Sequence, residues 1–244
     1  MTTITQKQFS FGAVISDSIS VFFANLVPFC VVALILLLPL LVYNLAVIGT
    51  PDPSAGAYSA GALLAIVIQM VLSQLMAATI AFGTFQYLRG QPISIGDSLS
   101  RGLSLILPVL GVAILVGLIT GIGMLLLVVP GIIASVMLWV AIPAAVVERP
   151  GVIDSLKRSV ELTKGYRWTI FGILIAIGIV LIIITFVLSY ILLSAAGYAV
   201  YNIGIWVLQA VMGAFSATAA AVGYYYLRGA KEGVDIGSIA KVFD

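Results

Sequence analysis

The side chains best suited to ligand binding form one basic set in the second half of the chain. Within eleven residues lie Lys157, Arg158, Lys164 and Arg167. Four cations beside a membrane span could bind the headgroups of anionic lipids, and Arg228, after the last apolar run, could join them. The same charges could instead only set the topology, with local ion pairs joining Asp154 to Arg158 and Lys157 to Glu161.

The composition argues against catalysis and against metal binding. The chain has no His, which removes the commonest general base and the commonest metal ligand. No charged residue falls in the middle of any predicted span, where ionisable groups mark proton, ion and substrate paths. We therefore expect neither an enzyme nor a proton-coupled pump, and no cofactor, metal or nucleic acid partner.

The basic set lies on a predicted amphipathic helix over residues 150–164. Pro150 suits the first turn of this helix and Gly165 suits its end. A helix with one apolar face beside membrane spans is typical of the membrane interface. The expected apolar face carries Val152, Ile153, Leu156, Val160 and Thr163.

The rest of the chain is apolar enough to be a membrane protein. Of its 244 residues 62% are hydrophobic and 8% are charged, whereas soluble domains carry about 25% charged residues. Apolar runs of span length predict an all-α polytopic protein in one integral membrane domain, residues 1–244, because helices satisfy their own backbone in lipid. The six spans are expected at about 27–49, 62–88, 105–127, 131–147, 168–190 and 203–227.

The charges also predict the orientation. All 11 Lys and Arg residues precede an odd-numbered span or follow an even-numbered one, and of the 9 acids only Asp52 falls elsewhere. The positive-inside rule therefore places both termini in the cytoplasm.

A short pattern occurs three times, each time before an odd-numbered span. Asp17-Ser18-Ile19, Asp97-Ser98-Leu99 and Asp154-Ser155-Leu156 share it. Eleven residues after each Asp comes a helix breaker, Pro28, Pro108 or Gly165. We expect three membrane hairpins, each preceded by a cytoplasmic-side amphipathic interfacial helix at about 9–24, 93–104 or 150–164, with the breaker turning the chain into the membrane.

Small residues within the spans predict close helix packing, inside one chain or between copies. The candidate faces consist of Gly117 and Gly121 in the third span, and of Gly213, Ala217 and Ala221 in the sixth. Neutral polar residues in the spans, such as Gln69, Thr120 and Gln209, could line a solute path. More often such residues form hydrogen bonds between helices, worth about 0.6 kcal/mol each.

Three segments resemble a known family. Glu148-Arg149-Pro150-Gly151, the run SLKRSVELTKG and the ending YYYLRGAKEGVDI are similar to the glycerophosphoryl diester phosphodiesterase membrane-domain family. The resemblance implies a multi-helix module of the bacterial inner membrane. It does not imply phosphodiesterase activity, because in that family the chemistry belongs to a soluble domain that uses His.

Two functions remain open. The first is a non-enzymatic integral membrane module that organises lipid or other membrane proteins, as a homo-oligomer in contact with membrane lipids. The alternative is a carrier or channel for an uncharged or lipid-like solute. A water-accessible polar path would favour transport, and a closed or lipid-filled apolar interior would favour the module.

Overall fold

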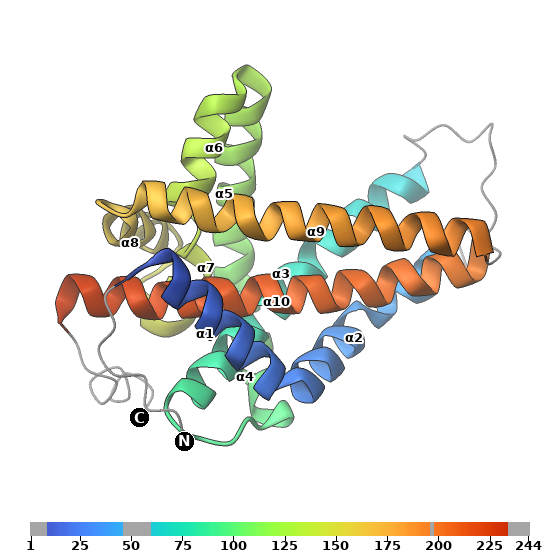
Figure 1. Ribbon diagram of the computed structural model, residues 1–244, viewed down its shortest axis with the longest axis horizontal. Coiled ribbons are helices and arrows are strands. Elements are labelled where there is room, and N and C mark those ends of the chain that lie inside the picture. The colour runs from blue at the N-terminus through green and yellow to red at the C-terminus, as the bar shows by residue number, and fades with distance from the viewer. Residues whose placement is uncertain (1–8, 46–59, 196–197, 234–244) are drawn as a thin grey trace.

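The computed structural model describes residues 9–45, 60–195 and 198–233, and in these ranges the chain is helical without any strand (Figure 1). This confirms the prediction of an all-α protein. In chain order the helices are α1 (Phe11–Ala24), α2 (Leu26–Tyr43), α3 (Ala60–Leu88), α4 (Ile95–Ser104), α5 (Ile106–Leu126), α6 (Val128–Met137), α7 (Ala141–Glu148), α8 (Val152–Thr163), α9 (Arg167–Ala195) and α10 (Tyr198–Glu232).

Six segments of the described chain are long and apolar enough to cross a membrane, as expected from the sequence. Their bounds are Leu26–Tyr43, Leu64–Leu88, Ile106–Leu126, Val128–Glu148, Arg167–Ser194 and Val200–Glu232. The fourth consists of α6 and α7, which are separated by a turn at residues 138–140. The residues at 46–49, expected to end the first span, lie outside the described ranges.

Helix α10 is the centre of the packing among the described residues. It contacts α1, α2, α3 and α9, and its residues Ala210, Ala214 and Tyr224 are fully buried. Figure 1 shows α9 and α10 running side by side, whereas the α5–α6 hairpin leaves the other helices at a wide angle. The core is therefore built around α10, and α5 and α6 form an arm beside it.

The helical structure is interrupted between each predicted amphipathic helix and the span after it. The breaks lie at Asn25, Leu105 and residues 164–166. Pro28 and Pro108 are the third residues of α2 and α5, where the missing N–H costs no helical hydrogen bond. Gly165 lies in the third break itself, with a φ of 94° that favours glycine. That these breaks turn the chain from the membrane surface into the membrane stays a prediction.

The small residues divide unequally between packed and open positions. A Cβ on Gly213 would lie 2.4 Å from the Met76 side chain. Ala217 and Ala221, on the same helix α10, are buried as well. Gly117 faces Met70 of α3 at ordinary contact distance, but Gly121 has open space around it within the described structure.

A close approach of α5 to α6 involves Gly123. A Cβ on this residue would lie 2.9 Å from the backbone of Gly131. A single extended residue, Leu127, separates α5 from α6, and α6 begins directly after it. The hairpin is tight because two glycines let the backbones of α5 and α6 meet.

Candidate functional site

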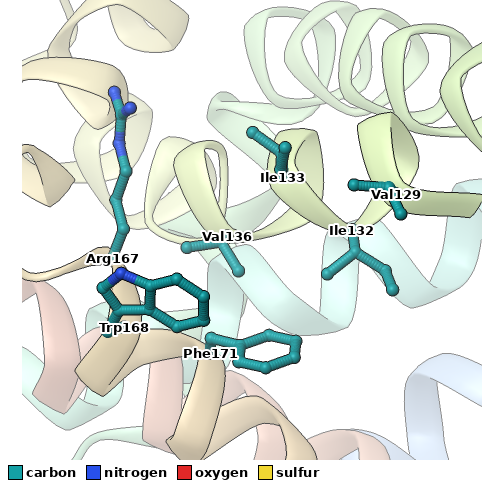
Figure 2. A pocket seen from close by; sticks show the side chains of 7 residues that line it. All are labelled: Val129, Ile132, Ile133, Val136, Arg167, Trp168 and Phe171. Atoms are coloured by element: carbon teal, nitrogen blue, oxygen red, sulfur yellow. The ribbon is translucent and has the colours of Figure 1, made fainter.

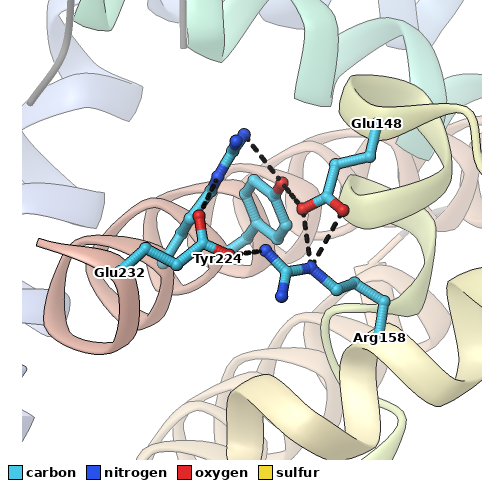
Figure 3. Close-up of polar contacts among 5 residues, drawn as sticks. Glu148, Arg158, Tyr224 and Glu232 are labelled. Carbon is cyan, nitrogen blue, oxygen red and sulfur yellow. Dashed lines mark hydrogen bonds and ion pairs between the residues drawn. The ribbon is translucent and has the colours of Figure 1, made fainter. Parts of the chain in front are cut away.

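A polar cluster joins the end of α7 to α8 and α10 (Figure 3). Glu148 is the last residue of α7 and its side chain is mostly buried. The Nε of Arg158 donates to both of its carboxylate oxygens at 2.9 Å. The hydroxyl of Tyr224, a fully buried residue of α10, donates to the same carboxylate at 2.6 Å. Two donors from different helices therefore hold Glu148.

A second carboxylate completes the cluster. Glu232, at the end of α10, accepts from the Nη2 of Arg158 and, at 2.8 Å, from the Nε of Arg228. Arg228 also donates to the Tyr224 hydroxyl at 3.4 Å. Burial alone would lower the pKa of Arg158, but its hydrogen bonds to Glu232 and Glu148 outweigh burial and raise this pKa. Two cations and two carboxylates thus balance, and Arg158 stays charged.

These contacts replace the ion pairs expected from the sequence. Asp154 pairs with Lys157 at 3.1 Å, and Arg158 reaches Glu148 and Glu232 instead of Asp154. The physical reason is burial, since the side chain of Arg158 is 22% exposed and a desolvated cation needs carboxylate partners. Arg158 and Arg228 are thus engaged inside the protein, and their predicted role as lipid contacts loses support.

The packed face of α8 differs from the expected apolar face. Ser155, Ser159, Leu162 and Thr163 are buried, whereas Ile153 is 61% exposed. Buried hydroxyls cost little when they are hydrogen-bonded. The predicted face lay too far toward the aliphatic side chains. The prediction rested on the hydrophobicity of the residues alone and took no account of the hydrogen-bond partners that a hydroxyl can find.

Two hydroxyls of this face complete the end of α6. The Oγ of Ser159 donates to the carbonyl oxygen of Met137 at 2.8 Å, and Thr163 reaches the same oxygen at 3.3 Å. Met137 is the last residue of α6, where the turn at 138–140 interrupts the helical hydrogen bonds. The interruption of the fourth span is therefore stabilised from α8, since a buried carbonyl needs a donor.

A tight link fixes α8 against α7. Arg149 adopts a left-handed conformation with φ 50° and ψ 40°, and Gly151 follows with φ 102°. Pro150 lies between them. This reversal allows Arg158 to turn back toward Glu148, ten residues earlier in the chain.

An apolar groove separates α6 from the start of α9 (Figure 2). Its volume is about 410 Å³, and it is lined by Val129, Ile132, Ile133, Val136, Arg167, Trp168 and Phe171. The rings of Trp168 and Phe171 meet edge to face with their centroids 5.9 Å apart. Figure 2 shows Arg167 at one end of the groove and Val129 at the other.

The structure separates Arg158, which is paired in the polar cluster, from the other three members of the basic set. Lys157 and Lys164 are exposed, and Arg167 is exposed at the groove while Trp168 beside it is 85% exposed. Neither Lys164 nor Arg167 forms an ion pair with another residue of the described ranges. Only Arg167 among the candidate lipid contacts lines the groove.

Two tyrosines of α10 are internal. Tyr224 and Tyr226 are at most 3% exposed, and the Tyr226 hydroxyl donates to the carboxylate of Asp17 in α1. Sequence reasoning missed both contacts, and it also missed Glu148. Its one available signal was an acid placed directly at the end of an apolar run, next to the reversal at Arg149 and Pro150.

The described side chains offer little for holding a metal. Their Asp, Glu and Cys residues form no group of three or more that could bind one ion. The polar cluster has its carboxylates already paired with arginines and a tyrosine, an arrangement that holds helices together.

The fold and the site define a multi-pass α-helical membrane protein. Residues 93–230, more than half of the chain, match the family described as a domain of unknown function, DUF7847. The chain belongs to this family. The comparison with curated proteins and the comparison with solved structures each gave no match. The matched region contains α4 to α9 and α10 up to residue 230, and with them the groove and all of the polar cluster except Glu232.

Proposed function

We propose that the protein is a non-enzymatic module of the bacterial inner membrane that organises lipid or other membrane proteins, with both termini in the cytoplasm. The observation that carries the proposal is the outward surface of two spans. In the most apolar stretches of α5 and α9, 17% of the residues are buried, compared with 39% or 44% in the other four spans. Such surfaces favour contacts with lipid or with a second copy.

The neutral polar residues support this choice over a carrier. The hydroxyls of Thr120, Ser135 and Thr218 each donate to the carbonyl four residues earlier in the same helix, at 2.7–2.9 Å. Gln69 of α3 bonds to Gln209 of α10 at 3.4 Å, which joins two spans. The first three bonds satisfy hydroxyls within their own helix, and the fourth is typical of packing between spans. The resemblance to the phosphodiesterase membrane-domain family agrees with the proposal, since it concerns a membrane module alone.

Native mass spectrometry of the full chain, released from membrane nanodiscs, tests the proposal. We expect a mass of more than one copy together with retained phospholipid. Vesicles that contain the protein should show the glycerol permeability of empty vesicles. A single lipid-free chain would contradict the module, and rapid glycerol entry would favour the carrier instead.

A further inference from the structure

We propose that the groove between α6 and α9 holds one acyl chain of a phospholipid whose anionic headgroup is bound by Arg167. This inference rests on the proposed function, since it requires a protein that contacts lipid. The groove has an apolar wall from α6 and a single cation at one end. An amphipathic ligand with a long tail and an anionic head matches this distribution of polarity.

The dimensions of the groove suit part of an acyl chain. Its volume of about 410 Å³ falls within the roughly 300–1,000 Å³ of ligand pockets. From Val129 to Val136 the groove follows α6 for about 10 Å, at about 1.5 Å per residue. Val136 is 4% exposed and forms an inner part of the wall, whereas Val129 and Ile133 are 65% and 49% exposed. The open side would let a lipid tail enter from the bilayer.

The charge at the groove end favours a phosphate. Unlike Arg158 and Arg228, Arg167 forms no ion pair with another described residue. A guanidinium binds phosphate oxygens through two parallel hydrogen bonds. Trp168 next to it has the amphipathic ring that membrane proteins place at headgroup level. Both residues begin α9, the end that the positive-inside rule places at the cytoplasmic face.

A second copy of the chain fits the groove less well. An apolar helix docked there would cover Arg167 without giving its charge a partner, and a charge buried in an apolar contact is costly. A phospholipid supplies the apolar tail and the compensating anion in one molecule. The occupant is therefore inferred from charge complementarity together with the apolar lining.

The test measures binding of two defined lipids to the delipidated full-length protein by native mass spectrometry. Phosphatidylglycerol and phosphatidylcholine with identical acyl chains are compared. We expect Arg167→Gln to weaken phosphatidylglycerol binding about fivefold, which corresponds to about 1 kcal/mol for one charge, and to leave phosphatidylcholine unchanged. We expect Ile133→Trp, which fills the groove with a bulky ring, to weaken the binding of both lipids.

Two matched controls lie outside the groove. Lys157→Gln removes an exposed charge from α8, and Ile183→Trp adds the same bulk to an exposed position of α9. Val129→Phe replaces Ile133→Trp as the groove-filling variant where the latter does not insert. The groove site is overturned if lipid binding falls no more in Arg167→Gln than in Lys157→Gln. It is also overturned if lipid binding falls no more in Ile133→Trp than in Ile183→Trp. The groove site is likewise overturned if the groove variants change the number of subunits but retain lipid, because the groove would then bind a second copy.

The outcomes also separate this inference from the proposed function. If the protein is an oligomer that retains phospholipid equally in all variants, the groove proposal is contradicted and the proposed membrane module is supported. If every sample contains only a lipid-free single chain, both the groove proposal and the proposed function are contradicted.

Discussion

The Nε of Arg158 lies 2.9 Å from each carboxylate oxygen of Glu148, and this contact joins α8 to the end of α7. Arg158→Gln should lower the free energy of unfolding by about 2 kcal/mol, because hydrogen bonds to charged groups contribute about 1.5–3 kcal/mol. Lys157→Gln is the matched control, since both members of its pair with Asp154 are more than 60% exposed, and exposed pairs contribute about 0–1 kcal/mol. Thermal unfolding in detergent measures both. Equal shifts would show that the cluster does not stabilise the fold.

The carbonyl of Met137 provides a second test. Ser159→Ala should destabilise the protein by about 1–2 kcal/mol, because a buried acceptor loses its closer donor and only Thr163, at 3.3 Å, remains. Ser104→Ala removes an equivalent hydroxyl at an exposed position and should change the melting temperature little. A Ser159→Ala variant as stable as wild type would mean that Thr163 alone satisfies the carbonyl.

The contact between α4 and α3 depends on one glycine. A Cβ on Gly102 would lie 2.0 Å from the Oγ1 of Thr79 and 3.1 Å from its Cβ. Gly102→Ala should therefore cost about 1–3 kcal/mol through overpacking, although alanine favours the helix by up to about 1 kcal/mol. Gly96→Ala, on the same helix with open space around it, should be neutral or stabilising. Destabilisation by both variants would point to the helix itself rather than to its contact with α3.

The predicted orientation is accessible to cysteine labelling in a Cys30→Ser background. Gly96 and Lys157 are exposed, so cysteines at these positions should react with an impermeant reagent only from the cytoplasmic side. Ser194 lies 27 residues beyond Arg167 in α9, about 40 Å along the helix, and should react only from outside. Ser155 is unsuitable because it is fully buried. Labelling of position 157 from outside would refute the orientation.

The spans could be predicted from the sequence because each depends on local composition alone. An apolar run of about 20 residues has few alternatives to a membrane helix. The contacts between distant segments carry no such local signal. Glu148 and Tyr224 are 76 residues apart, and nothing in either neighbourhood indicates the other.

The incorrect predictions about side chains have the same cause, since they too depend on partners from distant segments. The predicted pairs of Arg158 and Lys157 followed helical spacing, but Arg158 turned toward carboxylates from α7 and α10. The buried face of α8 was misplaced because its hydroxyls find carbonyls of Gly151 and Met137. The groove was missed because it depends on the angle between α6 and α9, which no sequence pattern encodes.

The contact of Asp17 with Tyr226 joins α1 and α10, the first and the last helix of the described residues. During synthesis Glu148 and Arg158 emerge close together, whereas Tyr224, Tyr226 and Glu232 are added only with α10. Proteins are made from the N-terminus onward, so α1 and the Glu148–Arg158 pair must wait for α10 before their partners exist. A chain terminated ahead of residue 224 would reach the membrane with its spans largely present and its carboxylates incompletely paired, a state that quality-control proteases could distinguish from the finished protein.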